Sequence, residues 1–243
     1  MSRLVRAAKG ARMGAGRLLD AGIDLVLSRS CVGCDVLGTT LCPSCWAAMC
    51  RQVGPHPQIT AWPVAIGSRY QDQAKAAIIA HKEHGVRSLT APLGTLLASA
   101  IATLTSGPTL LVTIPPHRGS VRARGADTTS LIAHRAAQVL THANQPARVQ
   151  QLLTRHQDNG KHVGRSAAQR QAAIRGAFQP RPKHIAKLAK FAGYRIIVVD
   201  DVITTGATTL EAVHTLLNAD VIVAGIAAVA GTPSHSWHST TQR

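Results

Sequence analysis

Two adjacent carboxylates, Asp200 and Asp201, follow an apolar run, and a segment rich in glycine and threonine comes directly after them. The apolar residues 196–199 predict a buried strand, and the residues from Ala207 onward predict a helix. The acids and the small residues therefore lie on a loop from the C-terminal end of a strand to the N-terminus of a helix. In open α/β sheets, ligands bind at such loops.

The small residues and the acids suit different parts of one ligand. N–H groups in the first turn of a helix lack intrahelical partners and lie at the positive end of the helix dipole, so they suit a phosphate. Small side chains let the backbone close around that phosphate, and hydroxyls add donors; these residues are Thr204, Thr205, Gly206, Ala207 and Thr208. Carboxylates repel a phosphate but accept hydrogen bonds from a diol. We therefore expect Asp200 and Asp201 to hold ribose hydroxyls beside a bound 5′-phosphate.

Neither of two common phosphate-binding fingerprints is present. The chain has no GxxxxGK[ST] motif, and the GAGR sequence at residues 14–17 follows no predicted strand, so it is not a dinucleotide fingerprint. The plain structural alternative for the two acids is that they only cap a helix and line a solvated turn.

Four cysteines form a second group with chemical potential. Cys31 and Cys34 make one CxxC, Cys42 and Cys45 make another, and seven residues separate the pairs. Two such turns direct four thiolates to one point, which predicts a structural Zn²⁺ site in a compact double knuckle. Disulfides and a redox CxxC are the alternatives. The remaining Cys50 reads as a plain packed thiol.

The elements that position these groups alternate along the chain. Strand-like runs cover residues 64–70, 110–114, 149–153, 195–199 and 221–230, and helical patterns cover residues 71–84, 92–104, 130–143, 167–174 and 207–218. This alternation predicts an α/β fold with a mostly parallel sheet flanked by helices. The Pro-rich stretch GPHPQITAWP, which ends at Pro63, reads as a linker.

Composition limits the classes of protein that fit. The 243 residues carry 27 Lys and Arg against 11 Asp and Glu, a net charge of +16, which favours a polyanionic partner such as nucleic acid. The aromatic share of 3% argues the other way, because single-strand binding relies on stacking platforms. No apolar stretch reaches the roughly 18 residues that span a bilayer. Asp20 and Asp24 interrupt the N-terminal apolar segment, which predicts a docked helix rather than a signal peptide, and hence a cytoplasmic protein.

The segment 197–208 resembles the 5-phosphoribosyl-1-pyrophosphate (PRPP) motif of type I phosphoribosyltransferases at every position. The resemblance implies PRPP binding through Asp200, Asp201 and the residues 204–208, with the acids as the catalytic pair and Mg²⁺ bound with PRPP. It also implies that the loop PPHRG after the strand at 110–114 faces the pyrophosphate. The pyrophosphate-side candidates are Lys82, Arg118, Arg122 and Arg124. Each of them is otherwise a solvated surface charge.

A four-cysteine knuckle before such a domain resembles the ComF family, bacterial proteins linked to DNA uptake. The residues that carry this resemblance are CPSCW at 42–46, Tyr70, Lys82, the Arg124–Gly125 pair, Arg155, Arg170 and Phe178. The chain departs from the family pattern at Ala126, Asp127, Thr128, His162 and Ala173. The expected domains are a helix and zinc-knuckle module with linker at 1–62, a PRPP-binding phosphoribosyltransferase-like domain at 63–231 and a disordered tail at 232–243. Trp46 is expected to pack the knuckle against the body.

Three functions remain open at this point. The resemblance favours a ComF-type, PRPP-binding protein that handles single-stranded DNA, with the DNA-uptake machinery as a further partner. A metabolic phosphoribosyltransferase with a small acceptor is the alternative, although Thr204 stands where purine transferases often place an Asp. A regulatory protein that senses PRPP is the third. The sequence gives neither the acceptor nor the oligomeric state.

Overall fold

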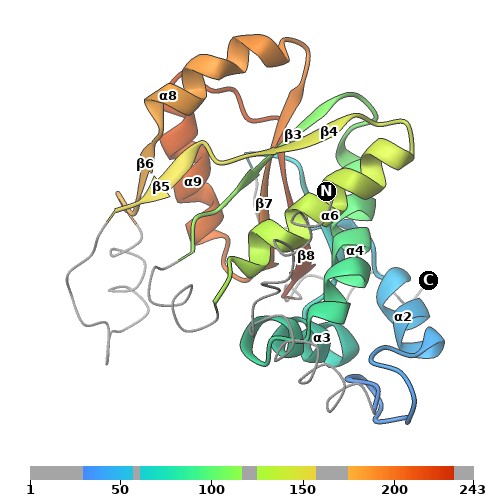
Figure 1. Ribbon diagram of the computed structural model, residues 1–243. Coiled ribbons are helices and arrows are strands. Elements are labelled where there is room, and N and C mark those ends of the chain that lie inside the picture. The colour runs from blue at the N-terminus through green and yellow to red at the C-terminus, as the bar shows by residue number, and fades with distance from the viewer. Residues whose placement is uncertain (1–29, 57–60, 117–124, 157–174, 233–243) are drawn as a thin grey trace, which may run out of the picture.

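The computed structural model describes residues 30–56, 61–116, 125–156 and 175–232 (Figure 1). Three predicted features lie outside these residues: the N-terminal helix, the helix at 167–174 and all but the first residue of the tail. None of the described helices is long and apolar enough to cross a membrane.

The main sheet has six strands in the order β1-β2-β8-β7-β3-β4. In that order they are Gly54–Pro55, Val64–Arg69, Gly225–Gly231, Arg195–Ile203, Thr109–Thr113 and Ala147–Gln150. Only β1 is antiparallel to its neighbour, whereas the other five strands pair in parallel. The predicted mostly parallel sheet is therefore confirmed.

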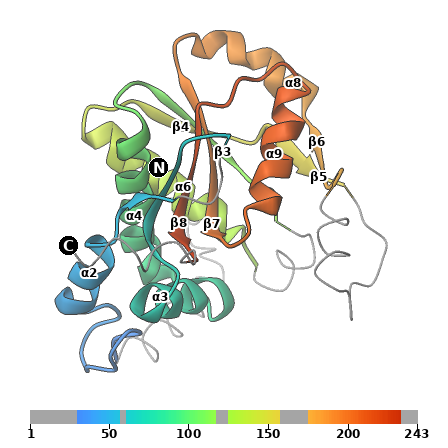
Figure 2. The same ribbon diagram turned by 180° about the vertical axis from the view of Figure 1, so that it is seen from behind.

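Helices cover both faces of this sheet (Figures 1 and 2). The helix α4 (Thr90–Leu104) and the helix α6 (Thr128–His142) pack on one face, and α9 (Ala207–Leu217) packs on the other. Successive residues of β7 pack on opposite faces of the sheet. Val199 packs with α4 and α6, and Val198 packs with α9. This alternation is the period of two that a strand buried on both sides requires.

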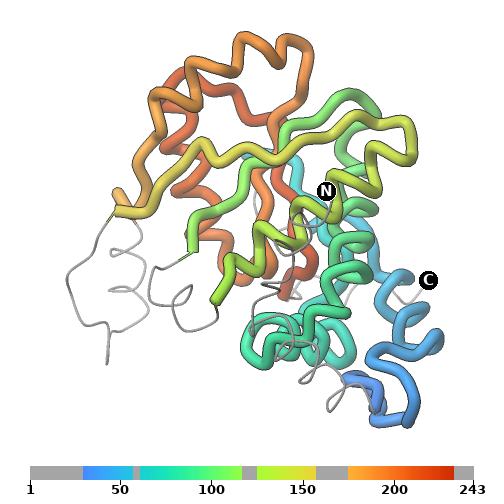
Figure 3. The backbone as a smooth tube through the Cα atoms, viewed as in Figure 1, coloured from blue at the N-terminus to red at the C-terminus, as the bar shows by residue number. Residues whose placement is uncertain are grey.

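The strands β3 and β7 are neighbours in the sheet, and Figure 3 shows the course of the chain around them. From β3 the chain passes through α6 to β4 on one side, whereas β7 pairs with the other side of β3. The strand order reverses at this point, and open α/β sheets bind ligands outside the carboxyl ends of the strands there.

The predicted strand at 149–153 is divided into two. β4 ends at Gln150, and the separate strand β5 (Leu153–Arg155) pairs antiparallel with β6 (Phe178–Pro180) in a small second sheet. The short helix α8 (Pro182–Ile185) and the 3-10 helix Ala186–Phe191 then lead to β7. The split follows from Leu152 and Leu153, which are buried in the α9-side core.

The cysteine module lies against α3 (Asp72–Glu83) and the sheet. Its helix α2 (Pro43–Cys50) buries Met49 in the core on the α4 side, and Trp46 packs against the same core, as predicted. The Gln52 side-chain oxygen accepts hydrogen bonds from the Ser68 hydroxyl (3.1 Å) and the Arg69 N–H (2.9 Å). The module is therefore joined to the sheet through both apolar packing and hydrogen bonds.

Candidate functional site

The strand β7 continues beyond the acids. The sequence predicts its end at Val199, but the strand runs to Ile203 and contains both Asp200 and Asp201. Pairing with β8 explains the longer strand, because Val202 and Ile203 stand opposite Ala230 and Gly231. The two carboxylates are therefore held by a central strand rather than by a loop.

Asp201 is paired with Lys82 of α3. The Lys82 Nζ lies 2.5 Å from Asp201 Oδ2, the Asp201 side chain is 8% exposed and the Lys82 side chain is 33% exposed. A buried carboxylate is stable only with hydrogen bonds or an opposite charge. The structure thus brings together two residues that the sequence predicts for different parts of the ligand.

Asp200 lies beside this pair and has a different electrostatic environment. Its Oδ1 accepts the N–H of Asp201 at 2.8 Å. Desolvation by the surrounding protein raises the pKa of Asp200 well above its ordinary value, and the charge of Asp201 raises it further. Lys82 acts in the opposite direction but does not cancel these effects. Asp200 is therefore the acid that most needs a further cation or hydrogen-bond donor.

His81, next to Lys82, is a buried polar residue that the sequence does not point to. Its Nε2 lies 2.8 Å from the Thr90 hydroxyl, and the residue is 1% exposed. Burial lowers the pKa of His81 to about 4, and the nearby Arg87 lowers it as well. The imidazole is thus neutral at pH 7, so Lys82 is the cation that balances Asp201. The position of His81 on the buried face of α3 is the sequence signal that could have identified it as a buried polar residue.

The predicted phosphate loop, residues 204–208, leads from the end of β7 into α9. Gly206 adopts a left-handed conformation with φ of 74° and gives no side-chain cap to α9, which begins at the next residue. The Thr205 hydroxyl accepts the Ala207 N–H at 3.4 Å. Thr204 and Thr205 are exposed. The first turn of α9 therefore offers its N–H groups to a ligand at the end of β7.

The segment after β8 holds this loop. Thr232 donates its N–H to the Ile203 carbonyl (2.9 Å) and its hydroxyl to the Thr204 carbonyl (3.2 Å). The buried His56, which follows β1, donates from Nε2 to the Thr232 carbonyl at 3.0 Å. The end of the cysteine module is thereby connected to the phosphate loop through two residues.

The pyrophosphate-side candidates are only partly described. Lys82 lies at the acid pair, whereas Arg118, Arg122 and Arg124 lie outside the described residues. Beyond them, Asp127 caps α6 by accepting the Ser130 N–H at 3.0 Å. Burial raises the pKa of Asp127, although the Ser130 N–H acts against this.

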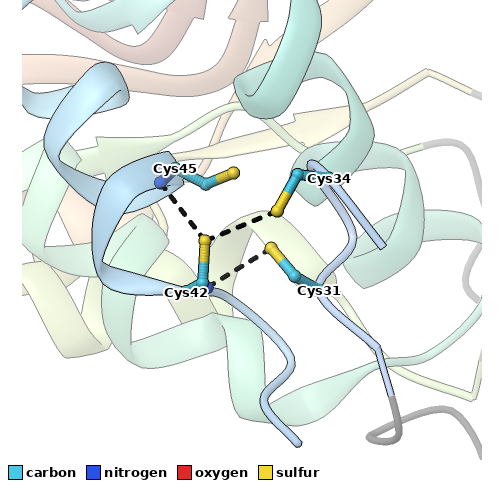
Figure 4. A group of neighbouring side chains, drawn as sticks. All are labelled: Cys31, Cys34, Cys42 and Cys45. Atoms are coloured by element: carbon cyan, nitrogen blue, oxygen red, sulfur yellow. Dashed lines mark hydrogen bonds between the residues drawn. The ribbon is translucent and has the colours of Figure 1, made fainter. Parts of the chain in front are cut away.

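The four cysteines converge on one point (Figure 4). Their sulfur atoms all lie within 4.8 Å of one another, and the Cys34 and Cys42 sulfurs are 3.6 Å apart. Tetrahedral zinc with Zn–S bonds of about 2.3 Å separates its sulfurs by about 3.8 Å, so a small contraction would complete the site. No disulfide joins these described cysteines.

Backbone donors support thiolates in this cluster. Cys31 Sγ accepts the N–H groups of Cys42 (3.3 Å) and Gly33 (3.4 Å), and Cys42 Sγ accepts the N–H of Cys45 (3.4 Å). The Ser44 hydroxyl and the Cys45 N–H lower the pKa of Cys42 to about 6. Burial raises the pKa of Cys45 well above its ordinary value. A dication among the sulfurs would hold all four as thiolates.

Residues 132–239 match the phosphoribosyl transferase domain. This part of the chain is similar to such domains. The matched residues include β7, both acids, the phosphate loop and α9. They leave out Lys82 and the cysteines. No curated protein matches the chain.

The match and the structure together confirm the predicted fold class. It is an α/β fold with a mostly parallel sheet flanked by helices, in which residues 132–239 match a phosphoribosyl transferase domain, preceded by a four-cysteine module whose geometry is close to that of a metal site.

Proposed function

We propose that the protein binds PRPP in the crevice at the ends of β3 and β7. The observation that carries this proposal is the order of features along β7 and α9. Two carboxylates on β7 are followed by a left-handed Gly206 and by a helix start whose N-cap residue has no side chain. The N–H groups around Thr204 to Thr208 bind the 5′-phosphate, and Asp200 accepts hydrogen bonds from the ribose diol. The ion pair between Asp201 and Lys82 fixes the end of β7 and balances the charge of Asp201.

Mg²⁺ fits this arrangement. Asp200 is a carboxyl whose ionisation is opposed by its surroundings, and a cation beside it would relieve that opposition. Magnesium commonly binds through one or two carboxylates together with substrate phosphates. When bound with PRPP, it would neutralise charge on the pyrophosphate.

The supported reaction is transfer of the ribosyl 5-phosphate group. The bond between the ribose anomeric carbon and pyrophosphate oxygen breaks, and pyrophosphate leaves with the electron pair. The acceptor forms the new bond to that carbon and loses its proton. The residues of this chain bind the phosphate, orient the ribose and place negative charge beside a ribose ring that becomes cationic in the transition state.

Calorimetric titration with PRPP and Mg²⁺ tests the proposal. We expect a dissociation constant in the micromolar range or tighter, about −8 kcal/mol, for the natural chain, and no measurable binding after Asp200→Asn with Asp201→Asn. Asp220→Asn is the matched control, because it removes an exposed carboxylate at a left-handed position that asparagine also tolerates. A natural chain that gives no heat of binding would contradict the proposal.

Single-stranded DNA is the partner that the charge and the ComF resemblance support. A net charge of +16 attracts a polyanion. The helix α2 of the cysteine module packs against α3, the helix that carries Lys82. We propose that the protein acts as a ComF-type DNA-handling protein that also binds PRPP. Titration with a labelled oligonucleotide should give an affinity that falls steeply with salt. Mg²⁺-dependent pyrophosphate release with a small acceptor, without DNA affinity, would instead support the metabolic transferase. PRPP binding with neither property would support the PRPP sensor.

A further inference from the structure

A cavity of about 180 Å³ lies between the end of β3 and the β5–β6 sheet. Its lining residue Thr113 pairs with Val199, the residue before Asp200. Its polar lining includes Asp127, Arg155 and Arg181, and its apolar lining includes Pro115, Pro116 and Leu153. Pockets for drug-sized ligands enclose roughly 300–1,000 Å³, so this one suits a single ring with one or two substituents.

Arg155 is held rigidly in the wall of this cavity. Its Nε donates to the Pro115 carbonyl at 3.0 Å, and its guanidinium carbon lies 4.6 Å from the centre of the Phe178 ring. Burial lowers the pKa of Arg155, although the charge of Asp200 acts in the opposite direction. Among the described residues, no carboxylate lies within ion-pair distance of Arg155. Its terminal N–H groups are therefore suited to a ligand that brings a planar oxyanion.

Asp127 gives the same cavity a second, opposite charge. Its carboxyl caps α6 through one oxygen, which leaves acceptor capacity on the carboxyl for a ligand N–H. The two charged residues are each coupled to one acid of the proposed PRPP site, Asp127 to Asp201 and Arg155 to Asp200. Because Thr113 of the cavity also pairs with Val199, one residue before Asp200, the cavity lies on the side of the sheet end at which the proposed ribose site stands.

We propose that this cavity is the acceptor site and that the acceptor is a small ring compound with a carboxylate next to an N–H group. This inference rests on the proposed PRPP-dependent transfer. Arg155 binds the carboxylate through its terminal N–H groups, Asp127 accepts a hydrogen bond from the N–H, and Pro115, Pro116 and Leu153 contact the ring.

Pyrophosphate is the competing occupant, and the lining disfavours it. Its several negative charges would lie against Asp127, and the side chains of Pro115, Pro116 and Leu153 offer it no hydrogen bonds. The second arginine of the wall, Arg181, donates to the Gln151 side chain at 3.5 Å. A single carboxylate on the Arg155 guanidinium, with a ring against the apolar residues, fits this lining better.

Fluorescence titration with 2-aminobenzoate tests the inference, and 2-aminobenzamide is the neutral ligand of the same shape. In the presence of PRPP and Mg²⁺, we expect the natural chain to bind the acid roughly tenfold or more tightly than the amide. Arg155→Gln should reduce this preference to about twofold or less, because the oxyanion then loses its charge-assisted partner. Arg148→Gln, which removes an exposed arginine from β4, should keep the preference. Asp127→Asn should weaken binding of 2-aminobenzoate relative to benzoate, measured by competition.

PRPP and pyrophosphate affinities are measured by calorimetry on the same variants. An acid preference that is absent from the natural chain, or that survives Arg155→Gln, overturns the inference. It is also overturned if Arg155→Gln weakens pyrophosphate binding and leaves 2-aminobenzoate unaffected, because the cavity then serves pyrophosphate. If the natural chain fails to bind PRPP but keeps an Arg155-dependent acid preference, the proposed function fails while the assignment of the cavity to a small acid stands.

Discussion

The cysteine cluster and the acid pair both gather groups that repel one another when ionised, but they differ in the cations that the described residues place beside them. Lys82 contacts Asp201 directly, whereas no basic side chain is among the described groups that shift the pKa values of the four cysteines. The cysteines instead receive backbone N–H groups, which support thiolates but do not neutralise them. We therefore expect the acid pair to fold before a ligand arrives, and the cysteine module to depend on an added metal ion.

Removal of the metal should therefore have the largest effect. Cys42→Ser takes away one thiolate of the cluster, and we expect it to lower the free energy of unfolding by about 3 kcal/mol or more and the Tm by roughly 6–12 °C. Zinc content should fall from one ion per chain to near zero, measured by elemental analysis. Cys50→Ser is the control, because Cys50 lies outside the cluster and should leave the zinc content unchanged. A Cys42→Ser protein with full zinc and an unchanged Tm would contradict the dependence.

Loss of the internal cation should have the next largest effect. Lys82→Met leaves Asp201 buried without its partner, and we expect a cost of about 2 kcal/mol in chemical denaturation. Lys75→Met on the same helix removes an exposed charge and should change stability by about 0.5 kcal/mol or less. The double variant Lys82→Met with Asp201→Asn should recover part of the loss. Equal effects of the two lysine changes would show that the pair adds no stability.

The phosphate loop provides a test that separates conformation from charge. Gly206→Ala places a side chain at φ of 74°, so we expect a loss of about 1–2 kcal/mol together with weaker PRPP binding. Gly107→Ala is the control, because Gly107 lies outside the left-handed region and no atom lies within 4 Å of an added Cβ. An alanine at 206 that costs no stability would mean that the left-handed turn is not required.

The smallest expected effect is the pH dependence of Asp200. Because folding raises its pKa above the ordinary value of 3.8, the native state binds this proton more readily than the unfolded chain. The resulting destabilisation is absent at low pH and grows as the pH rises from about 3.8 through the raised pKa. Asp200→Asn should therefore raise the Tm at pH 7 by roughly 2–4 °C, a gain of about 1 kcal/mol. The gain should disappear near pH 3.5, whereas a gain that is constant with pH would have another cause.

The sequence predicts the parts of this molecule that depend on local pattern. The β-branched run before Asp200 and the Gly-Ala-Thr start of α9 identify a strand, a turn and a helix, and the two CxxC pairs identify the cluster. These features are local, because each depends on residues within a dozen or so positions of one another.

Features that depend on distant contacts could not be predicted in this way. The ion pair joins Lys82 and Asp201 across 119 positions, and the tie to the phosphate loop joins His56 and Thr232 across 176. Arg155 is singled out in the sequence only by the ComF resemblance, and its place in a cavity wall depends on Pro115 and Phe178, which the fold brings beside it. The sheet topology produces these contacts, and local propensity carries no information about them.

PRPP binding by the natural chain and by the single variant Asp200→Asn is the most direct test of the account. This variant keeps the ion pair between Lys82 and Asp201, so its fold should be at least as stable as that of the natural chain. We predict calorimetric binding of PRPP with Mg²⁺ to the natural chain and an affinity that is roughly tenfold or more weaker for the variant, with an unchanged or higher Tm. Equal affinity in the two proteins, or no binding by the natural chain, would contradict the assignment of the acid pair and the phosphate loop to PRPP.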